Sequence, residues 1–279
     1  MAGSLTASRP RILINIPILN EIAVIETLLH RIMDVMNGHD YLILFVDDGS
    51  TDGTVEYLTR AIGKSHGRVA MISRTKTRGG CQRGAALLFG LKWGLCHGPF
   101  DIFVEMDGDL SHSPEEIPAG LEPIAQGRAD MVIVSKYLPE SGTTGRALSR
   151  NLISSICSIA SRSVIRWQIH DFSNGFRFFN FAAAQLVPQY KFHYGSPIYL
   201  TEVLAIWLAN GMRVVEIPGH YEGRNEGSSK VVVFDYIKAC IGVIDIGIRY
   251  RLIGFRKVDS HQAAVTSPPS ARILESRDK

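Results

Sequence analysis

The stretch DIFVEMDGDLSHSP, residues 101–114, passes from an apolar run directly into carboxylates. Residues 102–105 have the length and composition of a short buried strand, and Asp107 and Asp109 follow with one glycine between them. Because side chains alternate in an extended segment, both carboxylates point to the same side. Converging carboxylates repel each other unless a cation lies between them, and Mg²⁺ or Mn²⁺ prefers oxygen ligands. The pattern therefore indicates a divalent metal site, although a solvated acidic turn also fits.

Further short apolar runs rich in β-branched residues predict more buried strands. Between several of them, apolar residues follow helical spacing. Alternating strands and helices predict an α/β fold with an open, mixed but mostly parallel sheet flanked by helices. The expected strands are 12–16, 42–46, 69–73, 102–105, 131–135 and 214–217, and the expected helices include 21–36, 54–62 and 85–95.

Polar residues gather after the first two strands as well. Pro17, Asn20 and Glu21 follow the first, and the run DDGSTDGT, residues 47–54, ends the second. In open α/β sheets the ligand crevice lies at the carboxyl ends of the strands, so we expect these residues at one rim with the acidic pair. An aspartate there, such as Asp48, can accept hydrogen bonds from a ribose or a base. The same run also fits a turn that caps the following helix.

Composition limits the possible functions. The 279 residues are 46% hydrophobic, which suits one large domain or two small ones, and the net charge is only +3 with scattered Lys and Arg. These features do not favour a nucleic-acid partner. The four cysteines are widely spaced, which is typical of reduced thiols in a cytoplasmic protein. We find no apolar stretch of about 18–20 residues and expect a soluble or peripheral protein at the cytoplasmic membrane face.

Three motifs occur in a fixed order and spacing. They are Pro17-x-x-Asn20-Glu21, VDDGSTDGT at 46–54 and MDGDLSH at 106–112. Together they resemble the family 2 glycosyltransferases with the GT-A fold, a Rossmann-like nucleotide-sugar-binding fold. The resemblance implies sugar transfer from a nucleoside diphosphate donor, with Mg²⁺ or Mn²⁺ held by Asp107 and Asp109.

Motifs in the second half narrow the resemblance to dolichyl- and polyprenyl-phosphate mannosyl- or glucosyltransferases. They are IVSKY at 133–137, LSR at 148–150, DFSNGFR at 171–177 and RNEGSSK at 224–230. This group moves one hexose from GDP-mannose or UDP-glucose onto a polyprenyl monophosphate with inversion, and mannose from GDP-mannose is the expected reaction. The alternatives are a family 2 glycosyltransferase that acts on a soluble or glycolipid hydroxyl acceptor, and a non-catalytic relative that binds nucleotide sugars.

The resemblance also implies roles for individual residues. Catalytic roles fall on Asp107, Asp109 and Arg150. Donor contacts fall on Pro17, Asn20, Glu21, Asp48, Gly80, Arg83, Asp107, Arg224 and Lys230. Acceptor contacts fall on Lys136, Arg150 and Ser154. The family usually has Arg where Lys136 stands, and Lys lacks the bidentate fork of Arg. Because an acceptor phosphate is already an anion, the transfer would need no general base.

The helix expected over 145–165 places Arg150 and Ser154 one turn apart on one face. An Arg next to hydroxyls suits a phosphate, although an ordinary solvated helix face has the same pattern.

We expect a catalytic domain over residues 1–235, an amphipathic helix over 236–256 and a disordered tail over 257–279. The segment 231–255 is apolar on most of its circumference, with one narrow polar stripe formed by Asp235, Lys238, Asp245 and Arg249. Such a helix fits a membrane interface, and it also fits packing on the core or on a second subunit.

Overall fold

The computed structural model describes residues 9–74, 83–144, 158–194, 198–222, 233–258 and 272–274. Strand β1 (Arg11–Ile18) lies inside the sheet, where it pairs in parallel with β2 (Asp40–Asp47) on one side and with β4 (Ile102–Glu105) on the other. Most of its side chains are buried. β2 pairs in parallel with β3 (Val69–Ser73). The four strands therefore end at one edge, which brings the three polar segments of the sequence together.

The second half of the sheet is mixed. β7 (Arg177–Asn180) lies antiparallel between β4 and β5 (Met131–Ser135), and β5 pairs in parallel with β8 (Val214–Pro218). The order is β10-β3-β2-β1-β4-β7-β5-β8, and β6 (Gly142–Thr144) and β9 (His220–Glu222) form a small parallel pair. All six expected strands are confirmed, whereas β6, β7, β9 and β10 were not anticipated.

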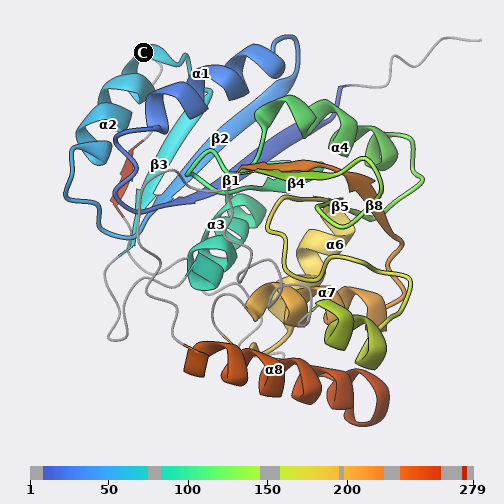
Figure 1. Cartoon of the computed structure of the whole chain (residues 1–279). Helices are drawn as coiled ribbons and strands as arrows, with labels where there is room; N and C mark the ends of the chain where they lie inside the picture. The colour runs from blue at the N-terminus through green and yellow to red at the C-terminus, as the bar shows by residue number, and fades with distance from the viewer. Residues whose placement is uncertain are drawn as a thin grey trace, which may run out of the picture.

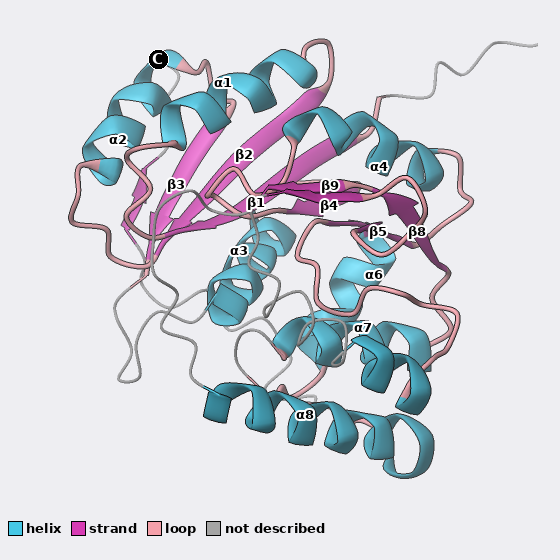
Figure 2. Ribbon diagram, in the orientation of Figure 1, coloured by secondary structure: helices cyan, strands magenta, loops and turns pink. Residues whose placement is uncertain are grey.

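Helices cover both faces of the sheet (Figures 1 and 2). On one face lie α1 (Ile25–Val35), α2 (Thr54–Lys64) and α4 (Ile117–Ala125), over a core cluster that includes Leu28, Leu58 and Phe178. On the other lie α3 (Arg83–His97), α6 (Phe181–Leu186) and α7 (Tyr199–Ala209), over a second cluster. Short 3₁₀ turns are Pro114–Glu116 and Val187–Gln189, and residues 158–164 are helical.

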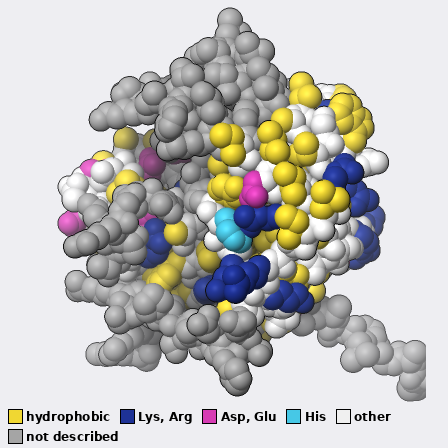
Figure 3. Space-filling view, turned by 90° about the horizontal axis from the view of Figure 1, so that it is seen from below, with side chains coloured by type: hydrophobic (Ala, Val, Ile, Leu, Met, Phe, Trp, Pro, Cys, Tyr) yellow, Lys and Arg dark blue, Asp and Glu magenta, His cyan; other side chains and the backbone are white. Residues whose placement is uncertain are grey.

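The outermost helix, α8 (Val233–Ile248), lies beyond α7 and continues into a π-helical turn, η3 (Arg249–Ile253). The expected boundary between residues 235 and 236 therefore falls inside this helix. α8 contacts the core through Val243 and Ile246 and leaves hydrophobic side chains on its outer side (Figure 3). Within the described segments, no helix combines the length and apolar character that a membrane span requires.

Within residues 257–279, expected to be a disordered tail, the structure describes one strand. β10 (Arg272–Leu274) pairs antiparallel with β3 at the sheet edge, and the backbone of Lys257 bridges Tyr190. Disorder was expected from the polar composition of residues 257–279. Residues 272–274 instead pair with the open edge of β3. Without them, the backbone groups along that edge would lack partners, because an edge strand has unpaired N–H and C=O groups.

A glycine in α4 sets how closely that helix approaches the sheet. A Cβ on Gly120 would lie 2.2 Å from Cε2 of the buried Phe178 ring. We expect Gly120→Ala to lower the free energy of unfolding by roughly 1–3 kcal/mol, because the ring must shift in a packed core. Urea unfolding measures the change.

Gly63, near the end of α2, is the matched control. A Cβ there meets nothing within 4 Å, so Gly63→Ala should raise the free energy of unfolding by up to about 1 kcal/mol. Equal effects of the two substitutions would contradict the close packing of α4.

Candidate active site

Two buried residues of opposite charge lie directly behind the acidic strand end. Glu105, the last residue of β4, is in register with Arg177 of β7, and both side chains are buried. Burial raises the pKa of Glu105 to about 7 and lowers the pKa of Arg177 to about 10, while the opposite charge of each partner works against these shifts. The Arg177 guanidinium also donates to three main-chain carbonyls, those of Asn174 (2.8 Å), Leu200 (2.7 Å) and Phe172 (3.0 Å). Arg177 therefore ties β7 to the 172–174 loop and to α7.

Asp107 lies two residues further on, at the rim. Its Oδ1 forms an ion pair with Nη2 of Arg83, the first residue of α3. A Cβ on the neighbouring Gly108 would lie 3.1 Å from the carbonyl oxygen of Pro17, so β1 and the D-x-D segment are in close contact. The structure thus brings together three residues predicted for the donor site, Asp107, Arg83 and Pro17.

Asp109 and Ser111 belong to a tight turn. Oδ1 of Asp109 accepts a hydrogen bond from the Ser111 amide at 3.0 Å, and Leu110 between them has a left-handed φ of 60°. The Ser111 hydroxyl is buried and has no hydrogen-bond partner among the described residues. The turn therefore collects carboxylate and hydroxyl oxygens of the kind that Mg²⁺ or Mn²⁺ binds.

The turn returns the chain so that His112 contacts Asp107. The Asp107 amide donates to Nδ1 of His112 at 3.0 Å, so the proton of a neutral ring is on Nε2. Burial lowers the pKa of His112, which favours this neutral form. Nε2 lies 3.8 Å from Oδ2 of Asp107, and the ring stacks on Phe176 with centroids 5.1 Å apart. The sequence analysis gave His112 no role, because its position depends on the left-handed turn at Leu110.

The loops after β1 and β2 are hydrogen-bonded to each other. The Asn20 amide donates to Ser50 Oγ at 2.9 Å, and Asn20 Oδ1 accepts from the Thr51 amide at 2.8 Å. The Glu21 amide donates to Thr54 Oγ1 at 3.0 Å. Asn20 and Glu21, predicted for the donor site, therefore also fix the shape of the rim.

Asp48, the other predicted donor residue in this region, is buried at the end of β2. Its Oδ1 lies 2.6 Å from Nε of Arg74, which follows β3. The carboxylate of the preceding Asp47 accepts hydrogen bonds from the amides of Gly49 and Ser50 and so closes the turn. The rim is held by side chains as well as by the sheet.

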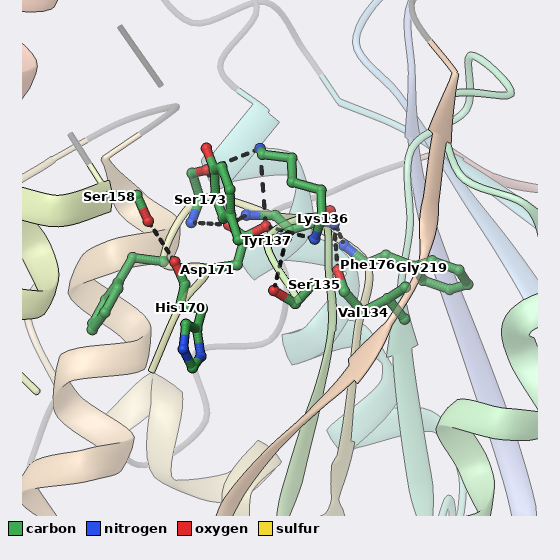
Figure 4. A network of polar contacts seen from close by, with 12 residues as sticks. Val134, Ser135, Lys136, Tyr137, Ser158, His170, Asp171, Ser173, Phe176 and Gly219 are labelled. Carbon is green, nitrogen blue, oxygen red and sulfur yellow. Dashed lines mark hydrogen bonds and ion pairs between the residues drawn. The ribbon is translucent and has the colours of Figure 1, made fainter. Parts of the chain in front are cut away.

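Lys136 lies just after β5, in a polar network (Figure 4). Its Nζ is 3.3 Å from Ser173 Oγ and 3.9 Å from Oδ2 of the fully buried Asp171. The same ammonium lies over the rings of Tyr137 and Tyr221, 5.1 and 5.9 Å from their centroids. This cage holds a cation in place without the planar fork of an arginine.

Tyr221 of β9 connects the two halves of the site. Its ring meets the His112 ring edge-on, with centroids 5.9 Å apart, and it also lies beneath the Lys136 ammonium. Tyr221 thus contacts both His112, which is hydrogen-bonded to the Asp107 amide, and the predicted acceptor cation. The remaining predicted residues, Gly80, Arg150, Ser154, Arg224 and Lys230, lie outside the described residues.

The described residues contain no group of three or more His, Cys, Asp or Glu side chains that could hold a metal ion. Two carboxylates and a hydroxyl suit a hard cation that keeps part of its shell for waters and for substrate oxygens. The donor set at this rim therefore fits the expected Mg²⁺ or Mn²⁺, held together with a phosphate-bearing ligand.

Comparison with known proteins agrees with this geometry. Residues 14–187 match the model of the family described as Glycosyl transferase family 2. The chain belongs to this family. It is 34% identical over 212 residues to polyprenol monophosphomannose synthase of Mycolicibacterium smegmatis, covering 75% of this chain and 77% of the relative. It is 33% identical over 250 residues to undecaprenyl-phosphate mannosyltransferase of Micrococcus luteus, covering 88% and 98%.

A solved structure with the same fold holds a metal and a donor. Glucosyl-3-phosphoglycerate synthase of Mycobacterium tuberculosis, in complex with Mn²⁺, UDP-glucose and glycerol 3-phosphate, superposes with a TM-score of 0.57 at 21% identity. The match covers 88% of this chain and 80% of that one. The expected GT-A fold is confirmed, and glycosyl transfer is the activity of the family.

The His112 geometry gives a prediction for this glycosyltransferase. Because Nδ1 accepts from the Asp107 amide, we expect His112→Ala to slow glycosyl transfer about 10- to 100-fold. His112→Asn should lose less, since an amide oxygen can accept the same hydrogen bond. Initial rates with each variant measure the difference, and equal losses would show that this hydrogen bond has no part in positioning Asp107.

Proposed function

We propose that this glycosyltransferase moves mannose from GDP-mannose onto a polyprenyl monophosphate. The names of the two relatives support this reaction, at 34% and 33% identity. The structural observation that carries it is the acidic rim, Asp107 and Asp109, together with the caged Lys136. Tyr221 links the two, because its ring contacts both His112, the neighbour of Asp107, and the Lys136 ammonium. The rim suits a metal-bound diphosphate, and the cation suits an anionic acceptor.

On the donor side, Asp107 and Asp109 would hold Mg²⁺ or Mn²⁺, with Ser111 Oγ within the same turn. When bound, the ion supplies positive charge to the departing diphosphate. Arg83 contributes a second positive charge beside Asp107, and His112 holds the Asp107 main chain through the hydrogen bond from its amide to Nδ1. Asn20, Glu21 and Asp48 shape the rim for the nucleotide, and Gly80, Arg224 and Lys230 are further donor contacts in this proposal.

On the acceptor side, Lys136 binds the phosphate monoester, together with Arg150 and Ser154. A phosphate oxygen forms the new bond to the anomeric carbon of the sugar, while the bond from that carbon to the diphosphate oxygen breaks. The nucleophile is an anion before the reaction, so no proton has to be removed. Positioning and electrostatic stabilisation then supply most of the rate enhancement. A single displacement of this kind inverts the configuration at the anomeric carbon.

The lipid acceptor requires that the protein reach a bilayer. The apolar outer side of α8 supports a peripheral position on a membrane, and we place the protein at the cytoplasmic face. In this proposal, α8 lies on the side of the enzyme that contacts the bilayer and its lipid acceptor.

The acidic rim can be tested with radiolabelled GDP-mannose, a polyprenyl phosphate and organic extraction of the product. We expect Asp109→Asn to lower the transfer rate at least about 100-fold, since a neutral amide binds a divalent cation poorly. EDTA should stop the wild-type reaction, and added Mn²⁺ or Mg²⁺ should restore it.

Glu122→Gln, on the exposed face of α4, is the matched control and should leave the rate unchanged. Full activity of wild type in EDTA would remove the metal from the mechanism. Transfer to a hydroxyl acceptor and not to a phosphate would replace the proposed acceptor class.

Lys136 gives a separate prediction about the acceptor. Lys136→Met should raise the KM for polyprenyl phosphate about tenfold or more, because a charge-assisted contact is lost. Lys136→Arg should keep the charge and retain a lower KM. The affinity for GDP, measured by calorimetry, should stay the same in both variants, and a selective loss of GDP binding would place Lys136 on the donor side instead.

A further inference from the structure

Two segments of the chain together form a surface that we call the apolar face. It consists of residues 158–167 and of α8 with η3. Its exposed hydrophobic side chains are Ile159, Trp167, Ile241, Ile244, Ile248, Leu252 and Ile253. Among the exposed large hydrophobic side chains of the described residues, only Ile22 and Phe181 lie elsewhere. Figure 3 views the molecule from the side of α8 and shows hydrophobic and basic side chains next to each other.

The outward row of α8 is not available for core packing, because the opposite side of the helix already fills that role. A Cβ on Gly247 would lie 2.7 Å from the Val164 side chain, and one on Gly242 would lie 2.9 Å from Ile198. Val243 and Ile246 are buried beneath the helix. Residues 241, 244 and 248, at i, i+3 and i+7, therefore point away from the protein.

Hydrogen bonds hold the two segments as one surface. Arg251 Nε donates to the carbonyl of Val164 at 2.6 Å and so joins η3 to the end of the 158–164 helix. Arg162 Nε donates to the carbonyl of Trp167 at 3.1 Å, and its guanidinium lies 4.5 Å from the centroid of that indole ring. Trp167 is 58% exposed despite these contacts, and Leu252 and Ile253 are 82% and 73% exposed.

Positive charge surrounds the apolar face. Residues 158–170 and 241–258 contain six cations, namely Arg162, Arg166, Arg249, Arg251, Arg256 and Lys257, and one acid, Asp245. Asp245 is already paired with Arg249 at 3.0 Å and accepts a hydrogen bond from the Tyr194 hydroxyl at 2.8 Å. An apolar ridge with a basic border is complementary to a bilayer that contains anionic headgroups.

We propose that the apolar face docks on an anionic lipid bilayer, with α8 and the 158–167 segment lying side by side in the interface. This deepens the proposed function, since a polyprenyl phosphate is met at the same surface. The Ser158 hydroxyl donates to the carbonyl of His170, next to Asp171, which binds the amide of Lys136 and pairs with its ammonium. Docking would thus place the surface next to this predicted acceptor cation at the headgroup layer.

Tryptophan fluorescence provides a direct readout. The chain has three tryptophans, and Trp93 and Trp207 are buried whereas Trp167 is exposed. Vesicles of phosphatidylcholine with about a third phosphatidylglycerol should shift the emission of the full-length protein to the blue. Trp167→Phe should remove this shift while vesicle flotation remains.

Two sets of variants separate the apolar and the electrostatic contributions. Leu252→Ser with Ile253→Ser should weaken flotation about tenfold or more, because two apolar anchors are lost. Phe181→Ser, at a 40% exposed hydrophobic residue on α6, is the matched control and should bind vesicles as wild type does. Arg166→Gln with Arg256→Gln should weaken binding about fivefold per charge, and only with anionic vesicles.

Unchanged flotation of the Leu252 and Ile253 variant, or no binding by wild type, would overturn the proposal. So would a dimer that this variant dissociates in the absence of any vesicle binding, since a second copy would then cover the face. Transfer to a short-chain, water-soluble polyprenyl phosphate tests the catalytic proposal separately. The variant should retain that transfer, whereas vesicle binding without transfer by wild type would remove the catalytic proposal alone.

Discussion

The buried guanidinium of Arg177 and the carbonyls that it binds are the contacts on which the arrangement of the site depends. A guanidinium without water contact needs hydrogen-bond acceptors within the protein, because a buried charge without them is strongly destabilising. Here the acceptors are main-chain carbonyls of the 172–174 loop and of α7, and the buried Glu105 of β4 is in register with Arg177. One side chain thus fixes the antiparallel strand β7 between two parallel parts of the sheet. It also brings the loop that contains Asp171 next to the acidic rim.

The charged side chains of the acidic rim and of the Lys136 region are each held by nearby protein groups. At the rim, the left-handed turn at Leu110 returns His112 to the Asp107 amide, which sets the tautomer of the ring. On the other side, Asp171 holds both the main-chain amide and the ammonium of Lys136. Each charged group has protein partners that orient it. The part of the site that the structure describes is therefore arranged before a substrate binds, which is how electrostatic stabilisation becomes effective.

Much of the fold could be predicted because its signals are local. Short β-branched runs gave the six main strands, and i, i+3, i+4 spacing gave α1, α2 and α3 within a few residues. β7 was missed because RFFN is short and begins with an arginine. That arginine is buried opposite Glu105, its register partner in β4, which lies far away in the sequence. His112 was missed for a similar reason, since its contact depends on one backbone angle. Motif order predicted roles for the rim and for Lys136, whereas Tyr221, which contacts both His112 and Lys136, became visible only in three dimensions.

In the proposed mechanism, the carboxylates after β4 hold a divalent cation against the diphosphate of the donor. A crystal soaked with Mn²⁺ and GDP tests this arrangement, because manganese can be located by its anomalous scattering. We predict one strong peak between Asp107, Asp109 and the diphosphate oxygens. A manganese peak at another place in the molecule, or bound GDP with no peak at this rim, would contradict it.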